Sequence, residues 1–311
     1  MRGHISFNKA QILITRKCNL SCQYCKISKK NMKELSLNEW KEAILILDNL
    51  GIKFIKIMGG EPTLKQDLED LIRFIKTNTK IKVALFTNSV LTCKRIDSLM
   101  DSKIDQYITS IDTINAVHSF NKDNAIKSGQ GLKALLYLVK KGFTDLRANI
   151  VVGKNNIQDI PRIVKYLSEK GIYSSLTPVH VGKEKFWQYR CPSSNLQLRP
   201  CDKKEVDKTF DELLRMKKEG ALIANSEQFI IDWSKYAIGT SWRCRVPPVL
   251  WIDSDGKMMC CNDIRGRTSS LSIFNLKDKV KYKRFIELIK KDAKKCPGCF
   301  YNCQYDGKIF V

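Results

Sequence analysis

Short apolar runs and longer amphipathic segments alternate regularly between residues 10 and 180. The apolar runs, such as Gln11-Ile12-Leu13-Ile14, have the length and composition of buried β-strands. The segments between them carry apolar side chains every three or four residues, which predicts helices that cover one face of a sheet. Strands are predicted at 11–14, 53–58, 83–87, 106–112, 147–152 and 173–179. Helices are predicted near 37–50, 68–75, 91–101, 128–141 and 157–170.

Local signals support the first helix and a parallel arrangement of the strands. Ser36 followed three residues later by Glu39 is a capping-box pattern, and Gly51 is placed to end the helix that follows. Six strand–helix units with short connections predict parallel strands joined by right-handed crossovers. The pattern is compatible both with an open doubly wound sheet and with a curved, incomplete barrel, and it does not distinguish the two.

The regular alternation ends after residue 182. Residues 183–240 contain a loop-like stretch and one amphipathic helix, and we interpret them as a bridge rather than an independent domain. Residues 241–311 hold two short apolar runs separated by Asp255-Gly256, which predicts a β-hairpin followed by a cysteine-rich tail. We therefore predict a core in residues 1–182, a bridging segment in 183–240 and a small C-terminal domain in 241–311.

Composition adds the class of protein and its compartment. The chain has 311 residues, of which 43% are hydrophobic, so it can bury a large core. No apolar stretch reaches about 18 residues, and the N-terminus lacks the apolar segment of a signal peptide. Twelve cysteines in such a chain indicate metal or redox chemistry in a reducing compartment rather than a disulfide framework. We expect a cytoplasmic protein without a membrane partner.

The net charge of +23 comes from 55 lysines and arginines against 32 acidic residues. Such a charge favours acidic partners, for example a phosphorylated small molecule or an acidic peptide. The basic residues are spread over nearly every segment, which fits a generally lysine-rich composition equally well. Because no compact arginine-rich or aromatic-interleaved patch occurs, we do not expect a nucleic-acid partner.

The first candidate site is a group of three cysteines, Cys18, Cys22 and Cys25, directly after the first predicted strand. Three thiolates folded around one point can hold three irons of a four-iron cluster and leave the fourth iron open to a ligand. The next cysteine, Cys93, is far away along the chain. A zinc site that lacks its fourth ligand, or a chance cluster of buried thiols, would have the same spacing.

A second motif, Gly59-Gly60-Glu61-Pro62, follows the second predicted strand. Two glycines allow the backbone to approach a ligand closely, and a carboxylate can pair with an ammonium group. Because both motifs follow strands of neighbouring strand–helix units, we expect them at the same edge of the sheet.

The two motifs resemble those of the radical S-adenosylmethionine (SAM) superfamily, including the aromatic Tyr24 before the third cysteine. The resemblance implies a partial (β/α)6 barrel of the TIM type with its chemistry at the C-terminal strand ends. It also implies that a [4Fe–4S] cluster on the three cysteines binds SAM and cleaves it reductively to a 5′-deoxyadenosyl radical, which abstracts hydrogen from a substrate. SAM-binding residues implied by the motifs and strand ends are Tyr24, Gly59, Gly60, Glu61, Pro62, Asn88, Ser110 and Asn149.

The C-terminal region carries a second cysteine group: Cys244, Cys260, Cys261, Cys296, Cys299 and Cys303. Zinc would take four of them in a closed tetrahedron, and an iron–sulfur cluster three or four. Strand alternation is expected to point Cys260 away from its neighbour Cys261.

The spacing of this group resembles the SPASM or shorter twitch extension of radical SAM enzymes. The tail is only C-x2-C-x3-C, which leaves too few ligands for two clusters. The resemblance therefore implies one auxiliary [4Fe–4S] cluster, held by four of the cysteines Cys244, Cys261, Cys296, Cys299 and Cys303.

The fate of the substrate radical defines the net reaction. The auxiliary cluster can accept an electron, which gives an oxidation or a cross-link. An epimerisation needs a hydrogen donor, and Cys191 and Cys201, just beyond the sixth strand, are candidate donors. The alternative, which we favour for each of them, is a packed or incidental thiol.

Two substrate classes fit the resemblance. We favour a maturase of a ribosomally made peptide, and the alternative is a dehydrogenase or epimerase of a small anionic molecule such as a sugar, nucleotide or antibiotic precursor. Few residues precede the first strand, so we expect a separate partner or direct recognition of the peptide. A non-catalytic iron–sulfur scaffold is disfavoured because the Gly59–Pro62 motif is intact. An electron donor such as flavodoxin or ferredoxin is expected as a partner.

Overall fold

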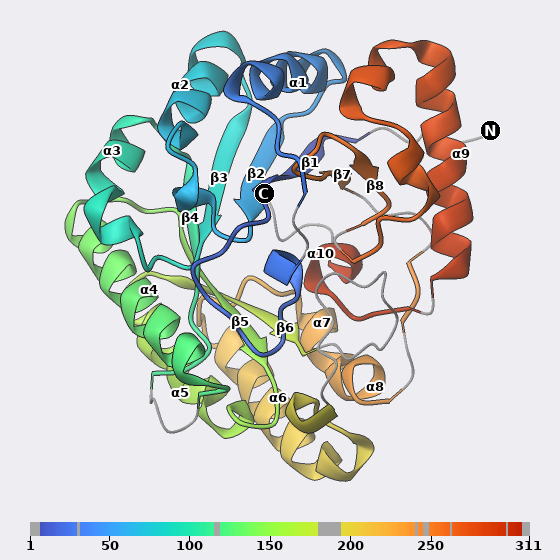
Figure 1. Cartoon of the computed structure of the whole chain (residues 1–311). Coiled ribbons are helices and arrows are strands. Elements are labelled where there is room, and N and C mark those ends of the chain that lie inside the picture. The colour runs from blue at the N-terminus through green and yellow to red at the C-terminus, as the bar shows by residue number, and fades with distance from the viewer. Residues whose placement is uncertain are drawn as a thin grey trace.

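One mixed sheet of eight strands forms the centre of the molecule, in the order β6-β5-β4-β3-β2-β1-β7-β8 (Figure 1). The computed structural model describes residues 7–29, 32–114, 119–179, 194–239, 242–244, 249–261, 263–296 and 298–306. Neighbouring strands are parallel throughout, except that β8 is antiparallel to β7. The strands are β1 Lys9–Thr15, β2 Phe54–Gly59, β3 Lys82–Thr87, β4 Gln106–Ser110, β5 Leu146–Val152, β6 Tyr173–Pro178, β7 Leu250–Ile252 and β8 Met258–Met259.

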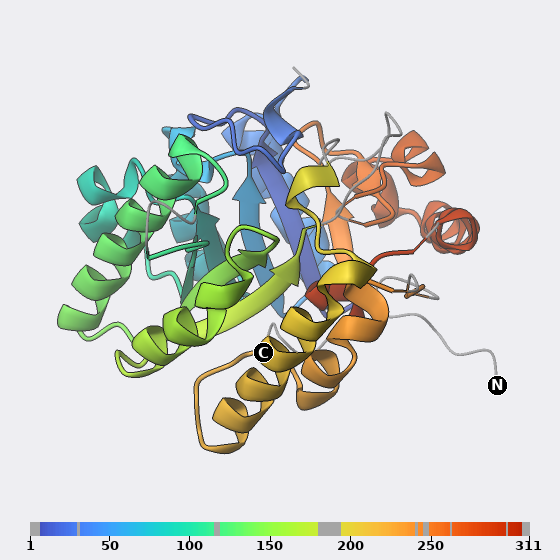
Figure 2. The same cartoon turned by 90° about the horizontal axis from the view of Figure 1, so that it is seen from below.

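The strand order distinguishes between the two predicted architectures. A doubly wound sheet reverses its strand order near the middle, whereas β1 to β6 here follow one another in chain order without a reversal. Their crossover helices consequently lie on the same, outer side of a curved sheet, as Figures 1 and 2 show. The fold is therefore a partial (β/α)6 barrel with a cysteine-rich C-terminal region, as the resemblance implied.

Six helices form the outer layer, and four more belong to the C-terminal half of the chain. The outer helices are α1 Leu37–Asn49, α2 Leu68–Asn78, α3 Ile96–Asp101, α4 Lys122–Lys140, α5 Ile160–Ser168 and α6 Lys203–Lys218. The others are α7 Glu227–Ile231, α8 Trp233–Ala237, α9 Lys279–Lys295 and α10 Asn302–Tyr305. Within the described ranges, no helix combines the length and apolarity needed to cross a membrane.

The local signals in the sequence act as expected in α1. The Ser36 hydroxyl accepts a hydrogen bond from the Glu39 N–H, and the Glu39 carboxylate accepts one from the Ser36 N–H at 2.8 Å. Gly51 has a φ of +83°, a conformation that favours glycine, and the helix ends just before it. The predicted capping box and helix end are therefore confirmed.

Two predicted helices have different boundaries in the structure. The helix predicted to begin near residue 128 begins at Lys122, because the Asn121 side chain accepts a hydrogen bond from the Asn124 N–H and caps it there. The helix predicted for 91–101 is divided at Arg95 into a short 3-10 turn, Thr92–Lys94, and α3.

The C-terminal region continues the barrel sheet rather than standing apart from it. The predicted hairpin is present as β7 and β8, and β7 pairs in parallel with β1. In the buried interior, Phe300 from the tail stacks on Phe229 of the bridging segment with their ring centroids 4.4 Å apart. The domain boundaries proposed from the sequence stay predictions, and the three ranges share one core.

Candidate active site

A cavity opens at the C-terminal ends of the barrel strands. Parallel strands end at the same edge of a sheet, so side chains far apart in sequence meet there. The walls come from the first cysteine loop, from β1 to β6 and from the C-terminal region. Lining residues that bear on the chemistry are Cys18, Cys22, Tyr24, Cys25, Lys56, Gly59, Gly60, Asn88, Ser110, Lys127, Asn149, Trp251, Tyr301 and Asn302.

The three cysteines of the first motif lie together on the rim of this cavity. A hydrogen bond of 3.0 Å from the Cys25 N–H to the Cys22 carbonyl turns the loop back on itself. Burial, with contributions from the Cys22 and Cys18 thiols, raises the pKa of Cys25 to about 12. Burial also raises the pKa of Cys18 to about 11, with Glu61 and Cys22 adding to it. Thiolates this close repel one another unless cations lie between them, so the set fits a cluster of positively charged irons.

The two glycines of the second motif are required by a close approach of two backbones. A Cβ atom on Gly59 would lie 2.2 Å from the Thr15 carbonyl oxygen. One on Gly60 would lie 2.2 Å from the Lys17 carbonyl oxygen, and the Gly60 N–H donates to the Thr15 carbonyl at 2.8 Å. The β2 turn thus lies directly against the loop that carries the cysteines, which leaves backbone exposed along the cavity.

Glu61, the third residue of that motif, points away from the cavity. Its side chain is fully buried, and one carboxylate oxygen accepts hydrogen bonds from the Thr63 N–H and hydroxyl and from the Thr87 hydroxyl, at 2.6–3.0 Å. The other oxygen accepts from the Asn88 N–H at 2.6 Å. In this structure the carboxylate thus fastens the turn after β2 to the end of β3 instead of facing a ligand. Its predicted contact with a SAM ammonium group, and that of Pro62, stay predictions.

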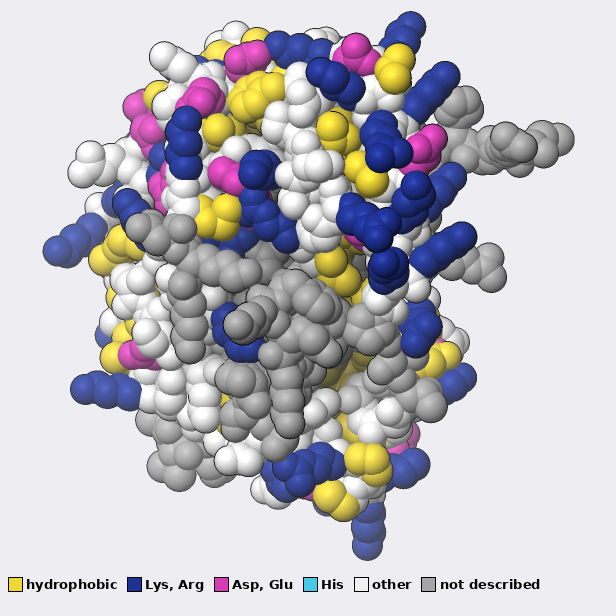
Figure 3. Space-filling view, turned by 45° about the vertical axis from the view of Figure 1, so that its right-hand side comes forward, with side chains coloured by type: hydrophobic (Ala, Val, Ile, Leu, Met, Phe, Trp, Pro, Cys, Tyr) yellow, Lys and Arg dark blue, Asp and Glu magenta, His cyan; other side chains and the backbone are white. Residues whose placement is uncertain are grey.

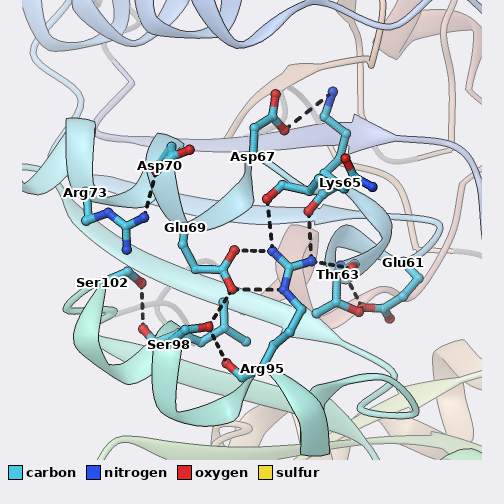
Figure 4. A network of polar contacts seen from close by, with 12 residues as sticks. Glu61, Thr63, Lys65, Asp67, Glu69, Asp70, Arg73, Arg95, Ser98 and Ser102 are labelled. Atoms are coloured by element: carbon cyan, nitrogen blue, oxygen red, sulfur yellow. Dashed lines mark hydrogen bonds and ion pairs between the residues drawn. The ribbon is translucent and has the colours of Figure 1, made fainter.

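A second polar network braces the same turn from outside (Figure 4). The Arg95 guanidinium donates to the Thr63 and Lys65 carbonyls at 2.6 and 2.9 Å and pairs with the Glu69 carboxylate. The Ser98 hydroxyl donates to the same carboxylate at 2.8 Å. The backbone that follows Gly59 and Gly60 is therefore held from both sides.

A triad of the half-buried Tyr24 and the buried Asp112 and Lys127 lies behind the cysteine loop. The Tyr24 hydroxyl donates to the Asp112 carboxylate at 2.5 Å, and the Lys127 ammonium lies 2.6 Å from the same carboxylate and contacts the Tyr24 hydroxyl. Burial opposes the charge on Lys127, but Asp112 and the thiols Cys22 and Cys25 outweigh it, so the pKa of Lys127 is raised. The triad therefore places a cation beside the cysteine loop.

Sequence reasoning missed Lys127. The signal that identifies it is its position on α4, where it shares the buried stripe of Asn124, Gly131, Ala134 and Leu138. A lysine on a buried helical stripe needs an anionic partner, here Asp112.

Three polar residues predicted at strand ends do line the cavity. The Asn88 side chain lies 3.8 Å from the Cys18 sulfur and donates to the Asn19 side-chain oxygen at 2.8 Å. Ser110 and Asn149 lie on neighbouring strands, paired with one another in the β4–β5 register. The structure brings all three to the wall where the resemblance places them, and their contacts with SAM stay predictions.

The second cysteine group is assembled from three separate segments. Burial, followed by the neighbouring Cys261 and Cys296 thiols, raises the pKa of Cys244 to about 12. Cys296 follows the last residue of α9, and the Cys299 N–H donates to the Trp242 carbonyl at 2.8 Å, which holds the tail beside the Cys244 segment. Four of the predicted ligands thus lie in adjoining segments.

One prediction about this group is wrong. Cys260 does not point away from Cys261, because β8 ends at Met259 and the chain turns, so that both N–H groups donate to the Ile264 carbonyl. The two thiols are hydrogen-bonded to one another, and that bond, followed by burial, raises the pKa of Cys261 well above its ordinary range.

The remaining candidate cysteines are distributed differently. Cys201 lies exposed on the short 3-10 helix Pro200–Asp202 and does not line the cavity, so the hydrogen-donor role predicted for it has no support from its position. Cys191 and the side chain of Cys303 lie outside the described residues. No described group of three or more His, Cys, Asp or Glu side chains is arranged to hold a single metal ion.

Comparisons with known proteins agree with this arrangement. The family model described as the Radical SAM superfamily matches residues 12–167, half of the chain. A probable GTP 3′,8-cyclase of Methanococcus maripaludis is 30% identical over 165 residues, which cover 52% of this chain and 55% of that protein. A second, from Methanococcus aeolicus, is 27% identical over 228 residues, covering 71% and 73%. The chain thus spans about half the length of the first of these relatives.

Solved structures share the fold at low sequence identity. Streptococcus suis SuiB bound to the precursor peptide SuiA superposes with a TM-score of 0.65 at 15% identity, over 97% of this chain and 76% of that one. The protein anSMEcpe with bound AdoMet and the Kp18Cys peptide gives 0.64 at 20% identity, over 93% and 86%. These likenesses extend over the C-terminal region as well as the barrel.

Proposed function

The chain belongs to the radical SAM superfamily and is a radical SAM enzyme, and we propose that its substrate is a ribosomally made peptide, which it oxidises, cross-links or epimerises. The observation that carries the proposal is a cavity that is lined both by the two motifs and by the C-terminal region. Trp251, Tyr301 and Asn302 are the lining residues from the C-terminal region. A peptide side chain placed in the cavity would lie beside the cysteine loop.

The residues divide into groups with separate tasks. Cys18, Cys22 and Cys25 would hold the [4Fe–4S] cluster, and Gly59 and Gly60 offer backbone to SAM. When bound, the cluster and SAM supply a 5′-deoxyadenosyl radical that abstracts a hydrogen atom from the substrate. Asn88, Ser110 and Asn149 are placed to orient SAM along the strand ends. The hydrogen bonds of the buried Glu61 carboxylate to Thr63, Thr87 and Asn88 fix the turn after β2 and the end of β3, and so restrict the motion of the SAM-binding residues there.

The C-terminal cysteines would hold one auxiliary [4Fe–4S] cluster. Burial, followed by the Cys261 and Cys296 thiols, raises the pKa of Cys244, so the ionised thiols need the same cationic compensation as the first group. Cys299 is the fourth ligand favoured by the described residues, because its segment is hydrogen-bonded to that of Cys244. Two proteins with this fold were solved with a peptide bound, SuiB with SuiA and anSMEcpe with the Kp18Cys peptide, and they support a peptide substrate.

A small anionic substrate is the second candidate. Lys56 and Lys127 both line the cavity, and Lys56 lies over the Phe86 ring at 4.5 Å, inside the barrel wall. Cations in a partly desolvated cavity attract phosphate or carboxylate groups. The relatives named probable GTP 3′,8-cyclases support a nucleotide as the small molecule to test.

One anaerobic experiment separates the candidates. Reconstituted protein is incubated with SAM and dithionite, alone, with candidate precursor peptides translated from short reading frames next to its gene, or with GTP, and 5′-deoxyadenosine and substrate masses are measured. We expect the peptide to increase 5′-deoxyadenosine formation and to lose hydrogen, or to take up deuterium from heavy water if it is epimerised. Conversion of GTP alone contradicts the peptide assignment. Absence of 5′-deoxyadenosine in every mixture indicates the non-catalytic scaffold.

A further inference from the structure

Helix α9 carries a concentrated positive charge on its exposed side. Its exposed basic residues, which we call the α9 face, are Lys279, Lys281, Lys283, Arg284, Lys290, Lys291, Lys294 and Lys295. Figure 3 shows lysine and arginine side chains gathered along the side of the molecule on which α9 lies. Glu287 is the single exposed acidic residue of this helix.

The charge of the α9 face is not neutralised within the described part of the chain. The ion pair recorded on it joins Arg284 and Glu287 at 3.6 Å. Asp292, the other acid of the helix, is buried and accepts a hydrogen bond from the Thr268 N–H at 3.0 Å. On α6, which has a similar number of basic residues, Lys203 pairs with Asp207 and Arg215 pairs with Glu219. The α9 face is therefore the more strongly charged surface.

The C-terminal half of α9 also contacts the second cysteine group. Cys296 caps the helix, and its N–H donates to the Ala293 carbonyl at 3.2 Å. The Cys260 sulfur lies 4.0 Å from the Ile289 carbonyl oxygen. The last two turns of α9 therefore contact the cysteine group on their inner side and carry Lys290, Lys291 and Lys294 on their exposed side.

An apolar layer connects the two cysteine groups. Cys25 of the first group and Cys299 of the second both pack against one cluster of buried side chains: Leu13, Ile27, Met58, Val249, Trp251, Met259 and Tyr301. The two cysteine groups therefore contact the same apolar layer from different segments of the chain.

We propose that the α9 face is the docking surface for an acidic one-electron carrier protein of the flavodoxin or ferredoxin kind, which exchanges electrons with the auxiliary site. This inference rests on the proposed function, because reductive cleavage of SAM is the process that consumes the electron. In the exchange, the reduced carrier would lose one electron and an iron–sulfur cluster held by Cys244, Cys261 and Cys296 would gain it, and no bond forms or breaks in either protein. An acidic face on the carrier complements the lysines and speeds productive encounter.

The surroundings of the α9 face favour a redox partner over other polyanions. Helix α9 has two aromatic residues, of which Phe285 is buried and Tyr282 is half-buried. The α9 face therefore lacks the exposed rings on which single-stranded nucleic acid stacks. A peptide substrate has to reach the cavity, which the residues of the α9 face do not line. An electron carrier gains from binding close to the second cysteine group, because a short distance favours electron transfer.

The test compares two charge-reversal variants of the reconstituted holoprotein. K290E/K291E/K294E alters the α9 face and leaves Lys295, the neighbour of Cys296, unchanged. K204E/K208E/K218E makes the same change of net charge on exposed positions of α6. Binding of oxidised flavodoxin is measured by calorimetry at low and moderate ionic strength, and circular dichroism and iron content verify that each variant is folded and loaded.

We expect the α9 variant to bind flavodoxin about tenfold or more weakly and the α6 variant less than about twofold, with the difference shrinking as salt rises. Equal weakening in both variants, or none in either, overturns the proposal. Loss of binding of heparin or of the precursor peptide, with flavodoxin binding unchanged, also overturns it and reassigns the face.

Cleavage of SAM driven by dithionite keeps this inference separate from the proposed function. The chemical reductant needs no docking surface, so the α9 variant is expected to form 5′-deoxyadenosine at the wild-type rate with it and at least about tenfold more slowly with limiting reduced flavodoxin. If the wild type forms no 5′-deoxyadenosine with dithionite, the proposed function is contradicted. The docking proposal is judged separately, from the ratio of the flavodoxin affinities of the α9 and α6 variants.

Discussion

The two cysteine groups differ in how the fold builds them. Cys18, Cys22 and Cys25 lie on one short loop between β1 and the 3-10 turn Ile27–Lys29, at the edge of the parallel sheet. The second group is drawn from three segments: the short described stretch 242–244, the turn after β8 and the end of α9. The sheet edge positions the first group, whereas the second group is brought together by packing between separate elements.

The frames around the two groups differ as well. Buried, fully bonded carboxylates at Glu61 and Asp112 stand behind the first loop. Behind the second lie a helix end and a turn. The first loop is joined to the β7–β8 hairpin by the buried ion pair of Arg16 and Asp253 at 2.5 Å. Strand ends fix positions more rigidly than turns do. Damage to the first frame should therefore have larger effects than damage to the second.

The largest effect is expected for Gly60→Ala. The added methyl group would overlap the Lys17 carbonyl oxygen at 2.2 Å and the Arg16 carbonyl oxygen at 2.6 Å, and neither backbone can move without displacing the cysteine loop. We expect a loss on the order of 4 kcal/mol in the free energy of unfolding. Urea unfolding of the cluster-free protein measures the stability, and equilibrium dialysis of the reconstituted protein should show SAM binding at least about a hundredfold weaker.

Gly129→Ala is the matched control for this substitution. Gly129 is exposed within α4, and a Cβ atom there meets nothing within 4 Å. Alanine should raise the stability by about 0.5–1 kcal/mol through its higher helix propensity. If Gly60→Ala kept wild-type stability and SAM affinity, the tight contact between the two backbones would not be what positions the first site.

Most of the first frame could be predicted from the sequence because its determinants are local. Apolar periodicity predicted the six barrel strands and most of their helices, and the motif spacing identified Cys18, Cys22, Cys25 and the glycines before any coordinates. Periodicity could not choose between barrel and open sheet, because both have the same local pattern and differ only in strand order.

The parts that escaped prediction depend on contacts between distant residues. Asp112 and Lys127 lie on different elements, and only the fold brings them to Tyr24. Cys260 was assigned an orientation from strand alternation, but the strand is too short to impose it and the turn to Ile264 decides instead. The sequence thus predicted which residues lie at the C-terminal edge of the sheet, but it did not predict the partners of buried polar groups.

An intermediate effect is expected for Lys127→Met, which removes the cation behind the first loop. Lys127 and Asp112 are almost fully buried and 2.6 Å apart, so methionine leaves the carboxylate without its counter-charge. Breaking such a pair destabilises a protein by roughly 3 kcal/mol. Thermal or urea unfolding of the apoprotein provides the measurement, and Lys133→Met, at an exposed position of the same helix, should change stability by less than about 0.5 kcal/mol.

The pH dependence of this loss follows from the raised pKa of Lys127. Folding holds the proton more tightly than the unfolded chain does, so the stabilisation is fully present below the ordinary pKa of 10.5 and disappears as pH rises through the higher folded value. The gap between wild type and Lys127→Met should therefore stay constant from about pH 7 to about pH 9. A gap that closes within this range would show that the lysine is neutral in the folded protein.

The smallest effect is expected for Cys260→Ala. This substitution tests which cysteines of the second group are cluster ligands and which only pack against them. The Cys260 thiol is buried against Ile264 and the Ile289 carbonyl, and Cys261 and Cys296 pack against the same cluster. The thiols that act on Cys244 are those of Cys261 and Cys296, and Cys260 is not among them. Cys260→Ala should therefore cost about 1 kcal/mol of stability and keep the full iron content. Cys261→Ala should lose the auxiliary cluster, and with it about half of the iron, while the first cluster keeps its electron paramagnetic resonance signal with SAM. The opposite outcome, with iron lost only from Cys260→Ala, would mean that the turn at Ile264 reorganises on cluster binding. The second site would then be formed by its cluster, in contrast to the first, whose frame the sheet provides in advance.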